Sequence, residues 1–152
     1  MLGGDNDPSK RAPMYWNAER NEGTTDLPPG CELPDQYPCG SLMEQKGDDL
    51  SVYNYYRRAI AIRKALPVIS HGVPGVETGL NTGCVSAYRK TWGEETVIIL
   101  MNIDEKAATV DVSGYEDWDL AVNLCVGEES VMMKEGSLQI PAWGVAVLRP
   151  AQ

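Results

Sequence analysis

Residues 84–103, which read CVSAYRKTWGEETVIILMNI, contain the pattern that decides the fold. A period of two runs through 84–90, and an apolar run rich in β-branched residues fills 96–103. Both features are typical of β-strands, and the segment Trp92-Gly93-Glu94-Glu95 between them is typical of a turn. The stretch therefore predicts two consecutive strands joined by a short connection.

The same pattern continues toward the C-terminus. Further strand candidates are 108–112, 120–125, 131–133, 137–140 and 144–148. Turn signals separate them at intervals of about 8–12 residues, a spacing typical of antiparallel sandwiches and barrels. We expect a mainly β fold, an antiparallel β-sandwich or barrel, over the second half of the chain.

One helix is predicted before these strands. Leu50–Lys64 carries apolar residues at helical spacing, and Pro67 forbids its continuation. Asp48 or Asp49 is placed to cap its N-terminus. A helix of this length is marginal on its own in water, so we expect its apolar face to pack against the sandwich.

The apolar face of this helix includes Val52, Tyr56 and Ile60.

Before the helix, residues 1–46 are punctuated by proline and glycine and show little periodic pattern. A run of this kind is unusual in a self-contained domain. It indicates either a functional loop or a segment that packs against a larger body from which it has been separated.

Length and charge narrow the function classes. The chain has 152 residues, 13 basic against 22 acidic side chains and a net charge of −9, which disfavours binding to a nucleic-acid backbone. No stretch approaches the roughly 20 consecutive apolar residues of a membrane span. Met1–Asp5 has neither a basic start nor an apolar core, so we expect no signal peptide in this sequence.

Cysteine and histidine give little support to metal or redox chemistry. Cys31, Cys39, Cys84 and Cys125 form no C-x-x-C pair, and His71 is the only histidine. We therefore predict no metal site and no cofactor. The first two cysteines could form a disulfide in an oxidising compartment, but free thiols are favoured, with the last two as core residues. The histidine is expected at the surface or at a helix end.

Acidic residues and tryptophans are the remaining candidates for chemistry. The acids of the second half fall at predicted turns, where solvated carboxylates normally lie, so none is expected to be catalytic: Glu94, Glu95, Asp104, Glu105, Asp117, Glu128 and Glu129. Trp92, Trp118 and Trp143 could grip a sugar, although packing within or between the sheets is favoured for each.

The segment Gly4–Trp16 is the most informative for function. Asp7 and Arg11 are an acid and a base four residues apart, and Pro8 suits the first position of a helical turn. The carboxylate could cap that turn and pair with the guanidinium, whose outer N–H groups would face hydroxyls. From these residues alone, a purely structural turn is favoured.

The same segment resembles the alpha-amylase family of glycoside hydrolases. The family pattern Asp-Pro-x-x-Arg-x-Pro-Met-x-Trp stands here as Asp7-Pro8, Arg11, Pro13-Met14 and Trp16. Residues 54–64, NYYRRAIAIRK, are similar to the last helix of the family's (β/α)8 barrel. Residues 138–148 are similar to the final strands of its domain C, a Greek-key β-sandwich.

The resemblance implies a division of the chain and a role for two residues. Residues 1–72 would be the tail of the catalytic barrel, and 73–152 would form domain C. Asp7 and Arg11 would hydrogen-bond substrate hydroxyls on the glycone side. The family's catalytic carboxylates come from earlier barrel strands, so the resemblance implies no catalytic residue and no calcium ligand in this chain.

Two classes of function follow from this. The chain would be the C-terminal part of a retaining hydrolase of α-glucosidic bonds in starch-like glucans, inactive alone, with the glucan and the missing barrel as partners. The alternative is a stand-alone, non-catalytic glucan-binding β-sandwich, and a purely structural domain is a further one. If the substrate is polymeric starch, the parent enzyme should work outside the cell.

Overall fold

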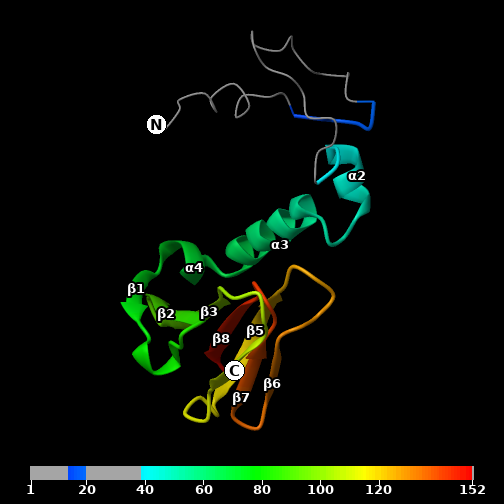
Figure 1. Cartoon of the computed structure of the whole chain (residues 1–152). Coiled ribbons are helices and arrows are strands. Elements are labelled where there is room, and N and C mark those ends of the chain that lie inside the picture. Colours follow the sequence, from blue (N-terminus) through cyan, green and yellow to red (C-terminus); the bar gives the residue numbers. More distant parts are fainter. Residues whose placement is uncertain (1–13, 20–38, 152) are drawn as a thin grey trace, which may run out of the picture. The chain divides into compact units, whose positions relative to one another are not determined.

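A computed structural model describes residues 14–19 and 39–151. Internal contacts divide the chain into two compact units, Met1–Asn54 and Tyr55–Gln152, so that the boundary falls within α3. The helices are α2 (Leu42–Gly47), α3 (Val52–Ala65), α4 (Pro67–His71) and the 3-10 helix η2 (Thr78–Leu80) (Figure 1). The strands are β1 (Val73–Val76), β2 (Val85–Trp92), β3 (Glu95–Asn102), β4 (Ala108–Asp111), β5 (Trp118–Leu124), β6 (Met132–Lys134), β7 (Ser137–Ile140) and β8 (Val145–Pro150).

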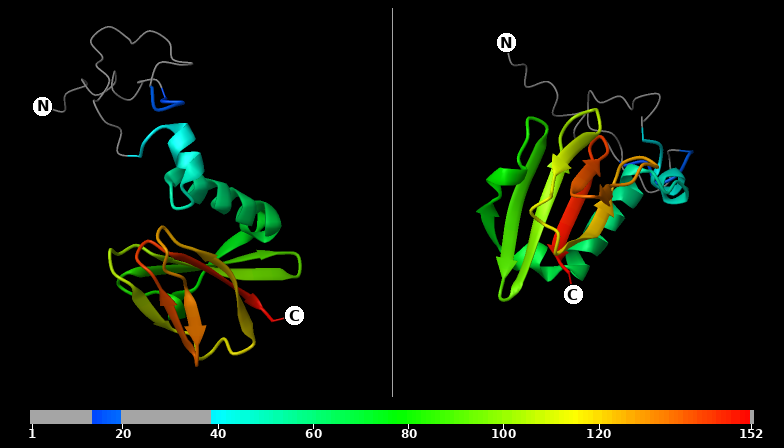
Figure 2. Two further views of the ribbon diagram at one scale, coloured as in Figure 1. Left: turned by 90° about the vertical axis from the view of Figure 1, so that its right-hand side faces the viewer. Right: turned by 90° about the horizontal axis from the view of Figure 1, so that it is seen from below.

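The second unit contains a two-sheet antiparallel β-sandwich, which confirms the predicted fold class. One sheet has the order β1-β2-β3-β8-β5 and the other β4-β7-β6. The two sheets face each other in Figure 2. The last strand, β8, lies between β3 and β5, so it pairs with segments far from it in sequence. The chain therefore crosses repeatedly between the sheets before it closes the larger one.

The main core lies between the two sheets. Alternate residues of the central strands point inward, as the burial of Ile98 and Leu100 in β3 and of Leu138 and Ile140 in β7 shows. Side chains one position along a strand point to the opposite face. In β4 those positions, such as Thr109, are exposed to solvent.

Strand β3 is buried on both of its faces. Val97 and Ile99 belong to a second apolar cluster with Val147 of β8 and Val68 of α4. Helix α4 packs on β2 and β3 and covers this face. The continuous apolar run 97–100 is therefore explained by a strand with one neighbour layer on each side.

Short elements escaped prediction. Strand β1 has four exposed residues, and α2 and α4 have six and five residues, so none carries a clear periodic signal. Pro67 does end α3 as expected, but it also begins α4 at a first-turn position where its missing N–H costs nothing. His71 is the exposed last residue of that helix, as predicted.

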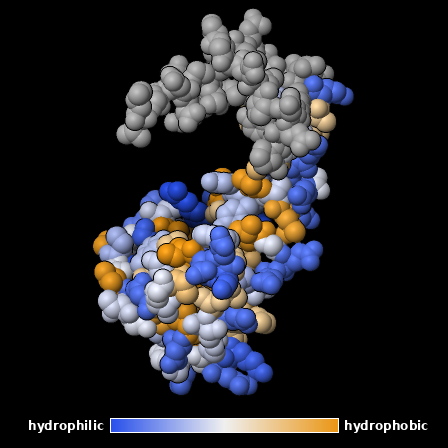
Figure 3. All heavy atoms as spheres, viewed as in Figure 1, coloured by the Kyte–Doolittle hydropathy of each residue, from blue (hydrophilic) through white to orange (hydrophobic). Residues whose placement is uncertain are grey.

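The expected packing of the long helix through its apolar face is wrong. Val52, Tyr56 and Ile60 are 51%, 64% and 52% exposed, and apolar side chains lie at the surface over α3 in Figure 3. Within the second unit the helix instead uses Arg58, whose guanidinium donates to the carbonyl of Cys125 at 3.2 Å. The neighbouring Tyr55 is half-buried. The predicted apolar face of the helix is therefore exposed in this chain.

The helix cap also differs from the prediction. The Ser51 hydroxyl accepts the N–H of Asn54 at 3.2 Å, which is the bond made by an N-cap residue. The Asp48 carboxylate accepts the N–H of Leu50 at 2.9 Å and thereby shapes the preceding turn. A serine three residues before the buried asparagine therefore begins α3.

Gly72 offers a test of how tightly α4 is seated on the larger sheet. A Cβ at this position would meet the carbonyl oxygen of Val68 and lie 3.0 Å from Cβ of Lys90. We expect Gly72→Ala to lower the free energy of unfolding by about 1–3 kcal/mol, because backbone atoms must shift to admit the methyl group. Equilibrium urea unfolding of the whole chain measures this.

Gly83→Ala is the matched control, since nothing lies within 4 Å of the added Cβ and its φ is not positive. Its stability should stay within about 0.5 kcal/mol of the wild type. Equal stability of the two variants would contradict the tight seating of α4.

Candidate functional site

The predicted binding residues Asp7 and Arg11 lie outside the described residues. The described part of their motif begins at Met14, where three residues alternate in exposure. Tyr15 is 3% exposed, whereas Met14 and Trp16 are 50% and 45% exposed. The tyrosine, which is not part of the family pattern, therefore anchors this segment, and the two pattern residues beside it face solvent.

Backbone hydrogen bonds join this segment to the start of α2. The N–H of Leu42 donates to the carbonyl of Tyr15 at 2.9 Å, and the N–H of Met43 donates to that of Trp16 at 3.1 Å. The first N–H groups of a helix have no partner within the helix. Here they are satisfied by the end of the motif, which is held against the helix as a result.

A capping box fixes the same end of α2. The Ser41 hydroxyl accepts the N–H of Glu44 at 3.3 Å, while the Glu44 carboxylate accepts the N–H of Ser41 at 2.7 Å. This reciprocal pair satisfies two donors at once and defines where the helix begins. A serine followed three residues later by glutamate is the sequence pattern of a capping box, so this pattern could have revealed the start of α2.

Asn54 holds the other end of α2. This residue is 7% exposed, and its side-chain amide donates to the carbonyls of Gln45 at 3.0 Å and Asp48 at 2.8 Å. Ser51 adds a 2.6 Å bond from its hydroxyl to the Gln45 carbonyl. The carbonyls that α2 leaves unpaired at its C-terminus are thus satisfied by side chains. Both ends of α2 are therefore held by side-chain hydrogen bonds.

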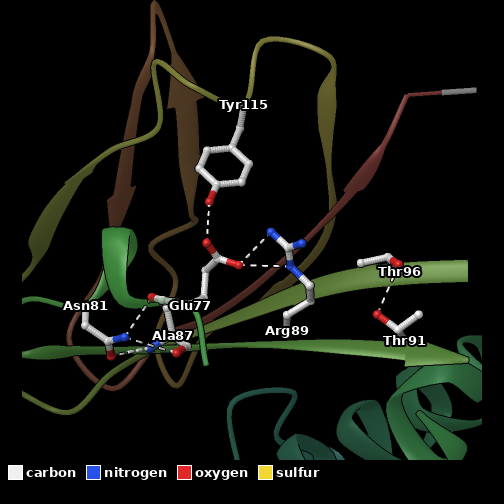
Figure 4. Close-up of polar contacts among 7 residues, drawn as sticks. All are labelled: Glu77, Asn81, Ala87, Arg89, Thr91, Thr96 and Tyr115. Carbon is white, nitrogen blue, oxygen red and sulfur yellow. Dashed lines mark hydrogen bonds and ion pairs between the residues drawn. The ribbon is translucent and has the colours of Figure 1, made fainter. Parts of the chain in front are cut away.

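In the second unit, a carboxylate is clasped between an arginine and a tyrosine (Figure 4). The Tyr115 hydroxyl donates to Oε1 of Glu77 at 2.6 Å, and Nε of Arg89 donates to Oε2 at 2.9 Å. The Glu77 side chain is 12% exposed. This contact ties the β1–η2 connection and β2 to the β4–β5 connection, so it links the two sheets.

Asn81 extends the same connection along β2. Its amide donates to the carbonyl of Glu77 at 2.7 Å, and its side-chain oxygen accepts the N–H of Ala87 at 2.9 Å. Beyond Val76, where β1 ends, this side chain takes over the hydrogen bonds that a neighbouring strand would make. The constellation joins residues 38 positions apart, which no local spacing in the sequence could reveal.

The acidic residues of the predicted turns are exposed, as expected. Among the described aspartates and glutamates, Glu77 is the only one outside the exposed class. Its two oxygens are occupied by Arg89 and Tyr115. A retaining glycosidase needs two carboxyl groups roughly 5 Å apart in a pocket. Among residues 14–19 and 39–151, Glu77 is the only acid shielded from solvent, so no second shielded carboxyl group accompanies it.

The tryptophans divide between surface and core. Trp92 and Trp143 are 47% and 50% exposed, so the favoured packing role is wrong for these two. Trp92 instead lies against His71, with ring centroids 5.1 Å apart. Trp118 is half-buried and packs against the main core, as predicted.

The described cysteines are divided between the core and the surface. Cys125 is buried in the main core, and burial raises the pKa of its thiol, whereas Cys84 is half-buried beside that core. Cys39 is an exposed free thiol, and Cys31 lies outside the described residues. Over the described ranges no three His, Cys, Asp or Glu side chains are grouped to hold a metal ion. The described helices include none long and apolar enough to span a membrane.

The sequence is similar to glycosidases and to one protein-family model. Residues 3–72 match the family model described as "Alpha amylase, catalytic domain". A probable alpha-glucosidase of Rhizobium meliloti (strain 1021) is 29% identical over 142 residues, which cover 93% of this chain and 24% of that protein. An oligo-1,6-glucosidase of Parageobacillus thermoglucosidasius is 25% identical over 142 residues, which cover 91% of this chain and 25% of that protein.

Among solved structures, Eubacterium rectale Amy13B superposes with a TM-score of 0.88 at 29% identity, over 99% of this chain and 29% of that one. Sequence and structure thus agree on a glycoside hydrolase class in which a catalytic-domain segment precedes a β-sandwich. The chain is therefore similar to the C-terminal part of alpha-amylase family proteins. It spans about a quarter of the length of these two curated relatives.

The Glu77 clasp predicts a stability loss at high pH. Burial raises the pKa of the Tyr115 hydroxyl above its ordinary value, and the hydrogen bond with Glu77 raises it further. The folded chain therefore holds this proton more tightly than the unfolded chain. The stability that this provides is complete below the unfolded pKa, about 10, and is lost as the pH rises through the folded pKa.

We expect Tyr115→Phe to be less stable than the wild type at pH 8 by about 1 kcal/mol, because Glu77 loses a donor. The variant should also lose less stability than the wild type between about pH 8 and pH 11. Urea midpoints at the two pH values measure both effects. Tyr56→Phe, which alters an exposed tyrosine, should behave as the wild type. Parallel pH profiles for Tyr115→Phe and the wild type would contradict the assignment.

Proposed function

We propose that this chain is the C-terminal part of an alpha-amylase-like glycoside hydrolase that acts on α-glucosidic bonds of starch-like glucans. Residues 1–72 would complete the catalytic barrel, and residues 73–152 would be its domain C. The match of residues 3–72 to the catalytic domain of the family carries this proposal. Relatives named as an alpha-glucosidase and an oligo-1,6-glucosidase support the class of bond.

The nucleophile and the acid/base would come from the larger part of the enzyme. The acids of the described residues are solvent-exposed, apart from Glu77, which is engaged by an arginine and a tyrosine. A general acid needs a raised pKa in a confined site, and a nucleophile needs a fixed distance from the sugar. Exposed turn carboxylates offer neither, so this chain would be inactive alone.

Asp7 and Arg11 would contribute to the substrate site of the intact enzyme. Arginine presents five N–H donors in a rigid fork, which suits vicinal hydroxyl groups as well as a carboxylate. Asp7 would hold that fork and accept a hydrogen bond from a sugar hydroxyl. The C-terminal end of their motif is hydrogen-bonded to the capped helix α2.

The proposal is tested by supplying the missing part. We expect the 152-residue chain alone not to hydrolyse starch, maltose or a nitrophenyl maltoside. A chimera in which it replaces the matched portion of Eubacterium rectale Amy13B should hydrolyse maltooligosaccharides. Turnover by the chain alone that disappears when one of its carboxylates is mutated would contradict the proposal, and so would a folded chimera without turnover.

In the same chimera, Arg11→Ala should remove a charged donor from bound sugar hydroxyls. Hydrogen bonds to charged groups contribute about 1.5–3 kcal/mol, so kcat/KM should fall roughly ten- to hundredfold. Lys10→Ala is the matched control, because it removes an adjacent cation that the family pattern does not include, and kcat/KM should stay within about twofold. Unchanged kcat/KM in Arg11→Ala, with unchanged stability, would remove Asp7 and Arg11 from the binding site.

A further inference from the structure

The second unit has a hollow that the catalytic proposal does not use. Its volume is about 480 Å³, within the range of roughly 300–1,000 Å³ for small-ligand sites. One wall is the β4–β5 connection with the start of β5, and the other is the β6–β7 hairpin. We call it the Tyr115 hollow, after the residue whose hydroxyl reaches Glu77 in Figure 4.

Its aromatic wall is rigid. The rings of Tyr115 and Trp118 meet edge to face, with centroids 5.6 Å apart and planes at 84°. The Tyr115 hydroxyl is fixed by Glu77, which Arg89 holds in turn. A surface aromatic that is locked before a ligand arrives loses little entropy on binding. These two side chains therefore form a preformed apolar wall, in which the edge of one ring meets the face of the other.

The opposite wall is tied to the first through the backbone. The hairpin turn contains Glu135 and Gly136, both at positive φ (50° and 75°), as a two-residue type I′ turn requires. The Gly136 carbonyl accepts the N–H of Val112 at 2.8 Å. This bond joins the hairpin to the end of β4, so the width of the hollow is set by main-chain contacts.

The rim is polar and mostly acidic. Glu116, Asp119, Lys134 and Glu135 are exposed around the hollow. Three carboxylates against one ammonium disfavour an anion, and the described residues have no acidic group arranged to hold a metal ion. Lys134 and Glu135 form an ion pair at 3.4 Å, and both are exposed. The carboxylates of Glu116 and Asp119 can accept hydrogen bonds, which matches a neutral ligand rich in hydroxyl groups. An aromatic wall with such a rim fits the C–H groups and the hydroxyls of a sugar.

We propose that the Tyr115 hollow is a non-catalytic binding site for a short stretch of α-glucan. The choice of α-glucan rests on the proposed function, whereas the saccharide chemistry rests on the hollow itself. Such a site would hold a polymeric substrate on the enzyme by a second attachment. Two linked contacts raise the effective concentration of the chain at the active site without any change in the chemistry there.

The test uses the full 152-residue chain and maltoheptaose. In two-dimensional NMR, added maltoheptaose should shift the Trp118 indole N–H and the backbone amides of Lys134 and Gly136. Asp119→Ala removes an exposed rim carboxylate, so it should weaken binding about tenfold without unfolding the chain. Asp117→Ala, an exposed acid outside the hollow, is the matched control and should bind within about twofold of the wild type.

Other results would overturn either the location of the site, the choice of α-glucan or the proposed function. Absence of shifts, or shifts centred on the exposed Trp92 or Trp143, would overturn the location. Stronger binding of cellohexaose than of maltoheptaose would overturn the choice of α-glucan. If the Amy13B chimera is active and the hollow does not bind, the inference fails alone. If the hollow binds and the chimera is inactive, the proposed function fails alone.

Discussion

The burial of β3 on both faces is the constraint on which the second unit depends. Ile98 and Leu100 point into the core between the sheets, and Val97 and Ile99 point toward α4. Full burial of a side chain of this kind contributes about 1.5–3 kcal/mol relative to exposure. A shift of one residue in the register of β3 would exchange the two sets, so the position of each neighbouring layer is specified by this strand.

A polar residue at the end of β3 completes the arrangement. Asn102 is 3% exposed, and its amide donates to the carbonyls of Lys106 at 2.7 Å, Pro141 at 2.9 Å and Ile140 at 3.1 Å. Its side-chain oxygen accepts the N–H of Asp104 at 3.1 Å. A buried amide costs free energy unless it is bonded, and this one has partners at both its nitrogen and its oxygen. It fixes where β3 leaves one sheet and where β7 leaves the other.

Sequence reasoning recovered the elements whose signal is local. Strands β2 and β3 were predicted within a few residues because period and β-branched content coincide there. Strand β1 and helix α4 were missed because tertiary contacts define them: Gly72 allows close approach to β2, and the Lys90 ammonium donates to the carbonyl of Ile69 at 2.9 Å. The Glu77 clasp joins positions whose proximity depends on the completed sandwich. By contrast, Asp7 and Arg11 were identifiable only through the family motif, and their binding role stays a prediction.

Native-state hydrogen exchange of the full chain tests most directly whether the fold depends on β3 rather than on the long helix. The most protected amides of a domain exchange only through global unfolding, whereas weakly packed segments open locally. The amides of β3 and β8 should exchange with the free energy of global unfolding. Those of Tyr56–Ala65, where Tyr56 and Ile60 are exposed, should exchange through smaller openings. Equal protection of that helix and β3 would contradict the central role of the buried strand.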